Sequence, residues 1–252
     1  MNAWVTSIHR YAVKGLSAER LEAVDLVADR LIPFDRRFAI AHGSAPVDQA
    51  APEWHSKAHF LQVMSVPKLA ALETEFDDAT TTLEIRRNGR QIARGDLTSR
   101  TGCTVIEQFF AAYAKSELRG APKVVDLGAR GYTDVDAPYL SIINLASVRD
   151  LERVVGKTVD PMRFRGNLLV DGLRPWEEME WVGRRLTIGT ATLQAEEIIG
   201  RCAATNVDPT TGQRDLTIPH DLQRGFGHTD CGVYVRVTGG GRIAADDTVI
   251  LA

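Results

Sequence analysis

Short stretches in which apolar and polar residues alternate recur along this chain, and they constrain its fold more than any other feature. Such period-two runs are typical of β-strands that bury one face. Alternation is seen at residues 4–8 and 21–27. Further strand-like runs lie at residues 37–41, 60–64, 81–86, 140–143, 167–170, 185–188, 192–199, 232–237 and 248–251. Gly, Asp and Pro separate them at close spacing, which favours barrels or sandwiches over alternating strand–helix units. The pattern predicts a mainly β fold with a few helices.

Two segments predict helices. Residues 101–118 place apolar side chains at helical spacing, so that one stripe can pack on a sheet. The second helix is expected over 147–155, because Ser147 and Asp150 resemble a capping box and Gly156 is a plausible C-terminal stop. A helix that begins at Ser147 would expose unpaired N–H groups that can hold an anion.

The stretch between these helices indicates a domain boundary. Residues 119–138 contain several Gly and Pro residues and little apolar periodicity, which is typical of a linker. The chain has 252 residues, enough for one to two domains. We therefore predict an N-terminal domain over 1–120 and a C-terminal domain over 121–252.

The charge balance and the cysteine content limit the partners and the compartment. Lys and Arg total 30 against 33 Asp and Glu, so there is no overall electrostatic reason to bind nucleic acid or an acidic membrane. No apolar run approaches the roughly 20 residues that span a bilayer, and the first fifteen residues do not resemble a secretory signal. Three cysteines are too few for a disulfide scaffold. We expect a cytoplasmic protein with free thiols.

Cys202 is a candidate reactive thiol. It follows Gly200, where a strand-like run ends, and precedes the sequence Asp-Pro-Thr-Thr-Gly at 208–212, which reads as a tight turn. A side chain at such a strand end can face a cleft. The adjacent Arg201 would favour the thiolate, the form that attacks electrophiles or binds soft metals. The alternative is a small core residue, which is the commoner role of a lone cysteine and the one that spacing alone favours.

Basic residues at the ends of strand-like runs form a second candidate group. They are Lys14, Arg36, Arg163, Arg165 and Arg201. The planar guanidinium is well suited to phosphate, so convergence of these side chains would form a pocket for a phosphorylated cofactor. Scattered surface charge is the alternative, and without a fold the sequence favours it. Asn167, which opens an apolar strand, either binds such a cofactor or caps a turn.

Taken together, the ordered motifs resemble the MOSC family, whose domain is named for the C-terminal part of molybdenum cofactor sulfurase. The resemblance implies an N-terminal β-barrel MOSC-associated domain followed by a MOSC β-barrel domain, over nearly the whole chain. Within the family, the chain is most similar to the mitochondrial amidoxime-reducing component and its bacterial relatives. The motifs are Tyr-Ala-Val-Lys-Gly at 11–15, Asp-Arg-Arg-Phe at 35–38, Ser-Ile-Ile-Asn-Leu-Ala-Ser at 141–147, Arg-Phe-Arg-Gly-Asn at 163–167, residues 200–212 and Phe-Gly at 226–227.

The resemblance implies a cofactor and the residues that hold it. Those relatives bind molybdenum through a molybdopterin, and one protein cysteine completes the sulfur ligands of the metal. Cys202 would be that ligand and the catalytic residue. The residues implied for cofactor binding are Lys14, Arg36, Ser147, Arg165, Asn167, Arg201 and Thr205. Pyridoxal phosphate is also associated with the family, but nothing in the sequence indicates a Schiff-base lysine, and Lys14 is better used on phosphate.

The resemblance also implies an activity. The expected function is reduction of small N-hydroxylated compounds, with electrons from a separate ferredoxin- or flavoprotein-type donor, because the sequence holds no iron–sulfur domain of the kind found in certain relatives. A sulfur carrier that uses a persulfide on Cys202, and a module that senses the cofactor without turnover, are the alternatives. Gly15 departs from the mitochondrial pattern, which has serine there, so one side-chain contact to the cofactor would be missing.

Overall fold

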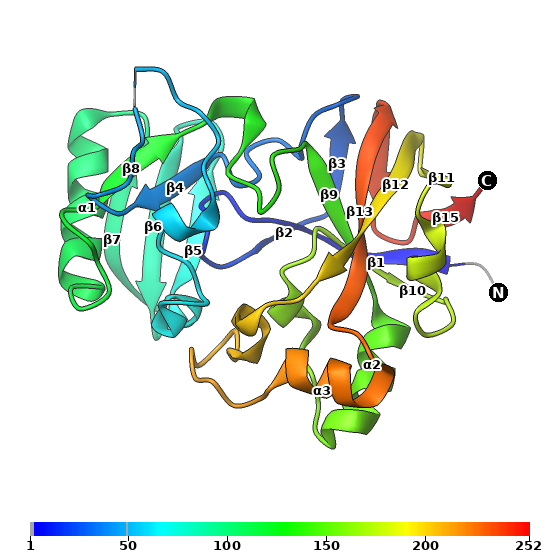
Figure 1. The fold of residues 1–252 in the computed structure, drawn as a ribbon. Coiled ribbons are helices and arrows are strands. Elements are labelled where there is room, and N and C mark those ends of the chain that lie inside the picture. The colour runs from blue at the N-terminus through cyan, green and yellow to red at the C-terminus, as the bar shows by residue number, and fades with distance from the viewer. Residues whose placement is uncertain (1–2, 49) are drawn as a thin grey trace.

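The structure, a computed structural model, describes residues 3–48 and 50–252, and in this part of the chain seven strands close into a β-barrel (Figure 1). Around the barrel the order is β10-β9-β13-β12-β11-β15-β1, and an antiparallel β1–β10 pairing completes the ring. The strands are β1 Ala3–Arg10, β9 Tyr139–Asn144, β10 Leu168–Asp171, β11 Arg185–Ile188, β12 Ala191–Gly200, β13 Asp230–Gly239 and β15 Thr248–Leu251.

Alternation of apolar side chains explains the barrel. Residues at every second position, such as Leu186 and Ile188 on β11 and Val233 and Val235 on β13, are fully buried in its core. The β9–β10 pair is parallel, and helix α2, Leu145–Val155, forms the crossover between the two strands. Helices α2 and α3, Ile218–Phe226, pack together at one end of the barrel (Figure 1).

The second lobe contains two small sheets and one long helix. Strand β4, Phe38–Ala41, pairs with β8, Lys123–Asp126, and β5, β6 and β7 form an antiparallel meander. The remaining elements are β5 Glu73–Asp77, β6 Thr82–Arg87, β7 Arg90–Asp96 and α1 Arg100–Tyr113. Helix α1 packs on β7, and the side chain of Ser99 caps it by accepting the Gly102 N–H. The core of this lobe is separate from the barrel core.

N-terminal strands tie the two lobes together. Strand β1 lies within the barrel and also pairs with β2, Glu19–Leu21, while β3, Ala23–Leu26, pairs with β14, Gly241–Ala244. The chain therefore begins and ends at the barrel (Figure 1). The boundary between residues 120 and 121 stays a prediction.

The mainly β fold with a few helices is confirmed, but individual elements differ from the prediction. The strand predicted at 60–64 is wrong: Phe60 forms only an isolated bridge with Ala41, and the chain then turns. Leu61 and Val63 reach the core from this turn without a strand ladder, so a short apolar run does not indicate a strand there. Strands β5, β7, β8 and β14 and helix α3 were not predicted. None of the described helices combines the length and apolarity needed to span a bilayer.

The start of α2 also differs from the prediction. The helix begins at Leu145, and the side chain of Asn144 caps it by accepting the Ala146 N–H at 2.9 Å. Ser147 is therefore not the N-cap but lies in the first turn, fully buried, where its hydroxyl donates to Glu178 and accepts the Trp176 N–H. The predicted capping box is wrong because a tertiary partner occupies the Ser147 hydroxyl.

Candidate functional site

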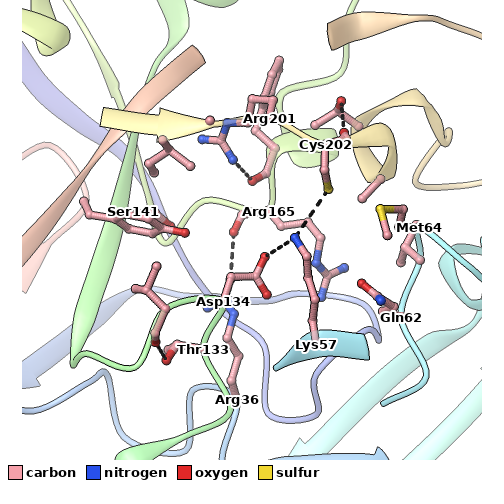
Figure 2. Close-up of a pocket in the computed structure, with 18 of the residues that line it drawn as sticks. Arg36, Lys57, Gln62, Met64, Thr133, Asp134, Ser141, Arg165, Arg201 and Cys202 are labelled. Atoms are coloured by element: carbon pink, nitrogen blue, oxygen red, sulfur yellow. Dashed lines mark hydrogen bonds and ion pairs between the residues drawn. The ribbon is translucent and has the colours of Figure 1, made fainter. Parts of the chain in front are cut away.

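A cavity of about 320 Å³ lies between the two lobes, a volume in the usual range for small-molecule sites. Segments far apart in the sequence line it: Lys14 and Lys57 come from the N-terminal lobe, and Arg165, Arg201 and Cys202 from the barrel. Figure 2 shows Lys57, Arg165 and Cys202 converging on this space, and Lys14 lines the same cavity. The basic residues are therefore not scattered surface charges.

Cys202 is held at the cavity by the end of a strand. Strand β12 ends at Gly200, and the short helix η6, Ala203–Asn206, starts after the cysteine. The Thr205 hydroxyl donates to the Cys202 carbonyl at 2.9 Å, which fixes the backbone there. The thiol is partly exposed, and Lys57 Nζ lies 3.8 Å from its sulfur (Figure 2). Cys202 is therefore not sealed in the core.

Lys14 is a buried cation paired with one carboxylate. Its Nζ lies 2.6 Å from Asp134 Oδ1 and donates to the Tyr132 carbonyl at 2.8 Å. Burial lowers the pKa of Lys14, and the charge of Asp134 opposes this effect. Partial desolvation acts to raise the pKa of Asp134, but Lys14 and Lys57 outweigh it, so that pKa lies well below its ordinary value. Asp134 therefore forms ion pairs with both lysines.

Arg36 and Arg165 both contact one aromatic ring. Their guanidinium carbons lie 4.6 Å and 4.3 Å from the centroid of Tyr11. Burial raises the pKa of Tyr11 to about 12, so the phenol stays neutral. Both arginines have left-handed backbones, with φ of 52° and 53°, a strain of about 1–3 kcal/mol each that is typical of binding sites.

The two arginines on the barrel side lack an acidic partner among the described residues. Arg165 donates to the Leu16 carbonyl at 2.7 Å, and Arg201 donates to the carbonyls of Phe164 and Cys231. Burial and the nearby Arg36 lower the pKa of Arg165. Carbonyl oxygens orient these guanidinium groups without neutralising them. A cavity with this surplus of positive charge suits an anionic ligand.

Arg163 does not belong to this unpaired group. Its guanidinium is buried and bonds to Asp215 at 2.8 Å and to Asp208 at 3.2 Å. These bonds anchor the turn after Cys202, in which Asp208 also accepts the N–H groups of Thr210 and Thr211. The tight turn predicted at 208–212 is confirmed, and Arg163 has a structural role in it.

Of the three residues predicted to hydrogen-bond to the cofactor, two line the cavity and one does not. Asn167 lines the cavity, but its amide already bonds to Ser141 and to the His9 carbonyl, which joins β9, β10 and β1. Thr205 lines the cavity and orients Cys202. Ser147 does not line it, because α2 buries the residue against Glu178. The structure thus brings together every predicted cofactor residue except Ser147.

Sequence reasoning missed Lys57, Asp134 and the role of Tyr11. Lys57 lies in the short helix η1, Lys57–His59, and Asp134 in the irregular segment before β9. Neither belongs to a motif, and no local pattern distinguishes them from surface charges. Tyr11 opens the Tyr-Ala-Val-Lys-Gly motif at 11–15, but its contact with two distant arginines depends on the tertiary fold.

The donor set at the cavity fits a metal only if a cofactor supplies most of its ligands. Among the described residues, no group of three His, Cys, Asp or Glu side chains is placed to hold a metal ion. Cys202 offers a single soft sulfur, and unpaired guanidinium groups lie nearby. One thiolate beside several cationic side chains could complete the sulfur ligands of a soft metal, while the cations bind the phosphate of the organic group that carries the metal.

The fold and the cavity define a class: two-lobed β-barrel proteins with a cationic, thiol-containing small-molecule site between the lobes. Comparison with known families agrees. Residues 2–121 match the MOSC N-terminal beta barrel domain, and residues 129–250 match the MOSC domain. The chain therefore belongs to the MOSC family.

Individual relatives match over part of the chain. It is 34% identical to molybdenum cofactor sulfurase of Anopheles gambiae over 112 residues, 40% of this chain and 14% of the relative. It is 31% identical to mitochondrial amidoxime-reducing component 1 of Homo sapiens over 99 residues, 39% of this chain and 28% of the relative. The chain thus spans under a third of these proteins. The solved YUAD protein from Bacillus subtilis is 12% identical, with a TM-score of 0.47 over 100% of this chain and 96% of that one.

Proposed function

We propose that this protein is a molybdenum-cofactor-dependent oxidoreductase that reduces small N-hydroxylated compounds. The observation that carries the proposal is the Cys202 thiol, which faces a cavity where Arg165 and Arg201 donate to carbonyls and have no acidic partner among the described residues. The similarity to a mitochondrial amidoxime-reducing component suggests the substrate class. The two-electron balance is an N-hydroxylated amine, two electrons and two protons giving the amine and water.

Each residue has a role that follows from its contacts. Cys202 would ligate the metal, and Thr205 holds its backbone. Lys14, Arg36, Arg165 and Arg201 would surround the phosphate and the pterin, because these cations converge on the cavity. Bound there, a molybdenum centre would supply the two-electron chemistry that cleaves an N–O bond.

The mouth of the cavity would receive the substrate. Met64, Tyr139 and the partly exposed Ile198 line it, so it can contact the apolar part of a small molecule. The electrons would come from a separate donor protein. In the described part of the chain, the three free cysteines belong to no group of three ligands that could hold a second metal site.

Metal and pterin analysis tests the proposal. Protein purified from a molybdenum-replete host should contain near-stoichiometric molybdenum and pterin and should oxidise a reduced dye when hydroxylamine is added. Cys202→Ala should lower dye oxidation at least a hundredfold, because the metal loses its protein ligand. Cys103→Ala is the matched control, since Cys103 lies in α1 away from the cavity. Wild-type protein without molybdenum or pterin would overturn the proposal.

A sulfur carrier is the competing function, because the chain is also similar to a molybdenum cofactor sulfurase. In that case Cys202 would hold a persulfide. Intact-mass measurement before and after a thiol reductant separates the two functions. A sulfur adduct that the reductant removes, and that is missing from Cys202→Ala, would favour the carrier.

A further inference from the structure

Two acidic residues, Asp134 and Glu197, line the cationic cavity, and Asp134 belongs to the segment that joins the two lobes. Asp134 Oδ1 lies 2.6 Å from Lys14 Nζ, and Oδ2 lies 3.6 Å from Lys57 Nζ. The Asp134 side chain is 48% exposed, whereas that of Lys14 is 6% exposed. Figure 2 shows Asp134 among the converging cations. The carboxylate thus occupies a position where it neutralises two lysines and can still leave.

The segment that carries Asp134 is irregular, and only its start is anchored in the core. Tyr132 is fully buried and its N–H donates to the Arg36 carbonyl at 2.7 Å, whereas residues 134–138 are exposed or partly buried. The segment runs from Gly131 to Pro138, between η3 (Gly128–Arg130) and β9. Lys14 donates to the Tyr132 carbonyl at 2.8 Å, and the Trp54 indole donates to the Thr133 carbonyl at 3.1 Å. The cation that Asp134 neutralises therefore also tethers the Asp134 segment, and Trp54 lies against it as a natural optical probe.

We propose that Asp134 is a built-in counter-ion that an incoming phosphate displaces from Lys14 and Lys57, so that occupation of the cavity releases residues 134–138, which lie outside the core. This inference rests on the proposed function, because it concerns the regulation of the same cationic site. A phosphate carries up to two negative charges and several acceptor oxygens, whereas the carboxylate offers one charge. Displacement leaves Asp134 in solvent, which its present exposure already allows.

The proposal makes a prediction for anion affinity that a simple structural ion pair does not make. The probe is inorganic phosphate, added to the full-length chain from a host that cannot make the molybdenum cofactor. Asp134→Asn should bind phosphate at least fivefold more tightly than wild type, because the internal competitor is lost. Isothermal titration at constant ionic strength measures the affinity, and the phosphate-induced rise in melting temperature should grow in parallel.

Asp136→Asn is the matched control. It removes the same charge two residues away, where Asp136 pairs with the exposed Arg130 at 2.7 Å and does not line the cavity. Its phosphate affinity should equal that of wild type. Equal or weaker affinity in Asp134→Asn, or the same gain in both variants, would overturn the proposal.

A second measurement needs no change at Asp134. Phosphate should alter the tryptophan fluorescence of the wild-type protein, because release of Asp134 changes the backbone next to Thr133, whose carbonyl accepts the Trp54 indole N–H. The change should be missing from Trp54→Phe. Saturable phosphate binding without a Trp54-dependent signal would show that the segment stays in place, and displacement would be wrong.

The two proposals fail separately. Molybdenum and pterin in the purified protein, together with unchanged phosphate affinity in Asp134→Asn, would remove only the counter-ion role. Tighter phosphate binding in Asp134→Asn, together with a protein that contains neither molybdenum nor pterin, would support the counter-ion role of Asp134 and contradict the proposed molybdenum cofactor.

Discussion

At the scale of single residues, Arg163 and Arg165 lie in one short motif but have different roles, which the local sequence does not distinguish. Arg163 is buried between two aspartates and is neutralised, while Arg165 is partly exposed, meets carbonyl oxygen and faces the cavity. The same short motif therefore provides a structural ion pair and an unpaired cation. The difference arises because Arg163 lies in the short helix η4, Pro161–Phe164, and Arg165 takes a left-handed backbone just after it.

Gly15 is the position at which the sequence departs from the pattern expected from the mitochondrial resemblance. The fold gives a local physical reason for glycine at this position. Its φ is +85°, and a Cβ there would lie 2.7 Å from the Leu61 carbonyl oxygen. A side chain at this position would therefore meet both backbone strain and a fixed backbone atom.

We predict that Gly15→Ala destabilises the protein by roughly 2–4 kcal/mol, because strain and collision add. Gly89→Ala is the matched control: Gly89 also has a positive φ, +71°, but a Cβ there meets nothing within 4 Å. It should lower the free energy of unfolding by only about 1 kcal/mol. Urea denaturation measures both changes, and equal costs would contradict the collision at Gly15.

At the scale of elements, the start of α2 depends on a buried acid from another segment. Glu178 is fully buried in the short helix η5, Glu177–Trp181, and accepts hydrogen bonds from Asn144 at 2.8 Å and from Ser147 at 2.9 Å. Asn144 in turn caps α2. The carboxylate thus joins the helix cap to η5, which explains why Ser147 is used away from the cavity.

We predict that Glu178→Ala lowers the free energy of unfolding by about 2–4 kcal/mol, because it leaves one N–H of the buried Asn144 amide and the Ser147 hydroxyl without their acceptor. Chemical denaturation measures the change. Glu180→Ala, at an exposed position in the same short helix, should have little effect. Equal destabilisation by the two substitutions would contradict the role of the buried network.

Burial raises the pKa of Glu178, although the bonds from Asn144 and Ser147 favour the carboxylate. Unfolding returns the group to its ordinary, lower pKa. The unfolded state therefore binds fewer protons in the window between the two values, and the folded state loses stability as the pH rises through that window. The pH slope of the unfolding free energy should be smaller in Glu178→Gln than in wild type.

At the scale of the whole molecule, β1 makes the barrel depend on the start of the chain. It pairs with β10 and β15, and it places Val5 and Ile8 in the barrel core. Without β1, the ring would open and expose the edges of both neighbouring strands.

We predict that the fragment 121–252 alone shows no cooperative thermal transition and aggregates. Joining residues 1–27 to this fragment through a flexible Gly/Ser linker should restore a cooperative transition, because it returns β1 and the β3 partner of β14. Calorimetry and light scattering of the two chains provide the measurement. A cooperative transition in the shorter fragment would show that the barrel closes without β1.

Much of the architecture and part of the site could be predicted from local pattern. Short strand-like runs identified all seven barrel strands, of which β9 and β10 are buried on both faces. The end of β12 at Gly200 marked Cys202 as a side chain that can face a cleft. The prediction at 60–64 was wrong because a turn can also bury alternate residues. Strand β8 was missed because its pairing with β4 joins segments about eighty residues apart.

The sequence by itself determined that the chain is mainly β and that basic residues and a cysteine lie at strand ends, since these properties depend on neighbouring residues. Only the tertiary structure decided which cations remain unpaired, and it placed Lys57 and Asp134 beside Lys14 and Cys202. The reason is that charge pairing depends on distances between side chains in space. These distances are determined by how the two lobes pack, because the paired residues are far apart in the sequence. Local sequence contains no measure of those distances.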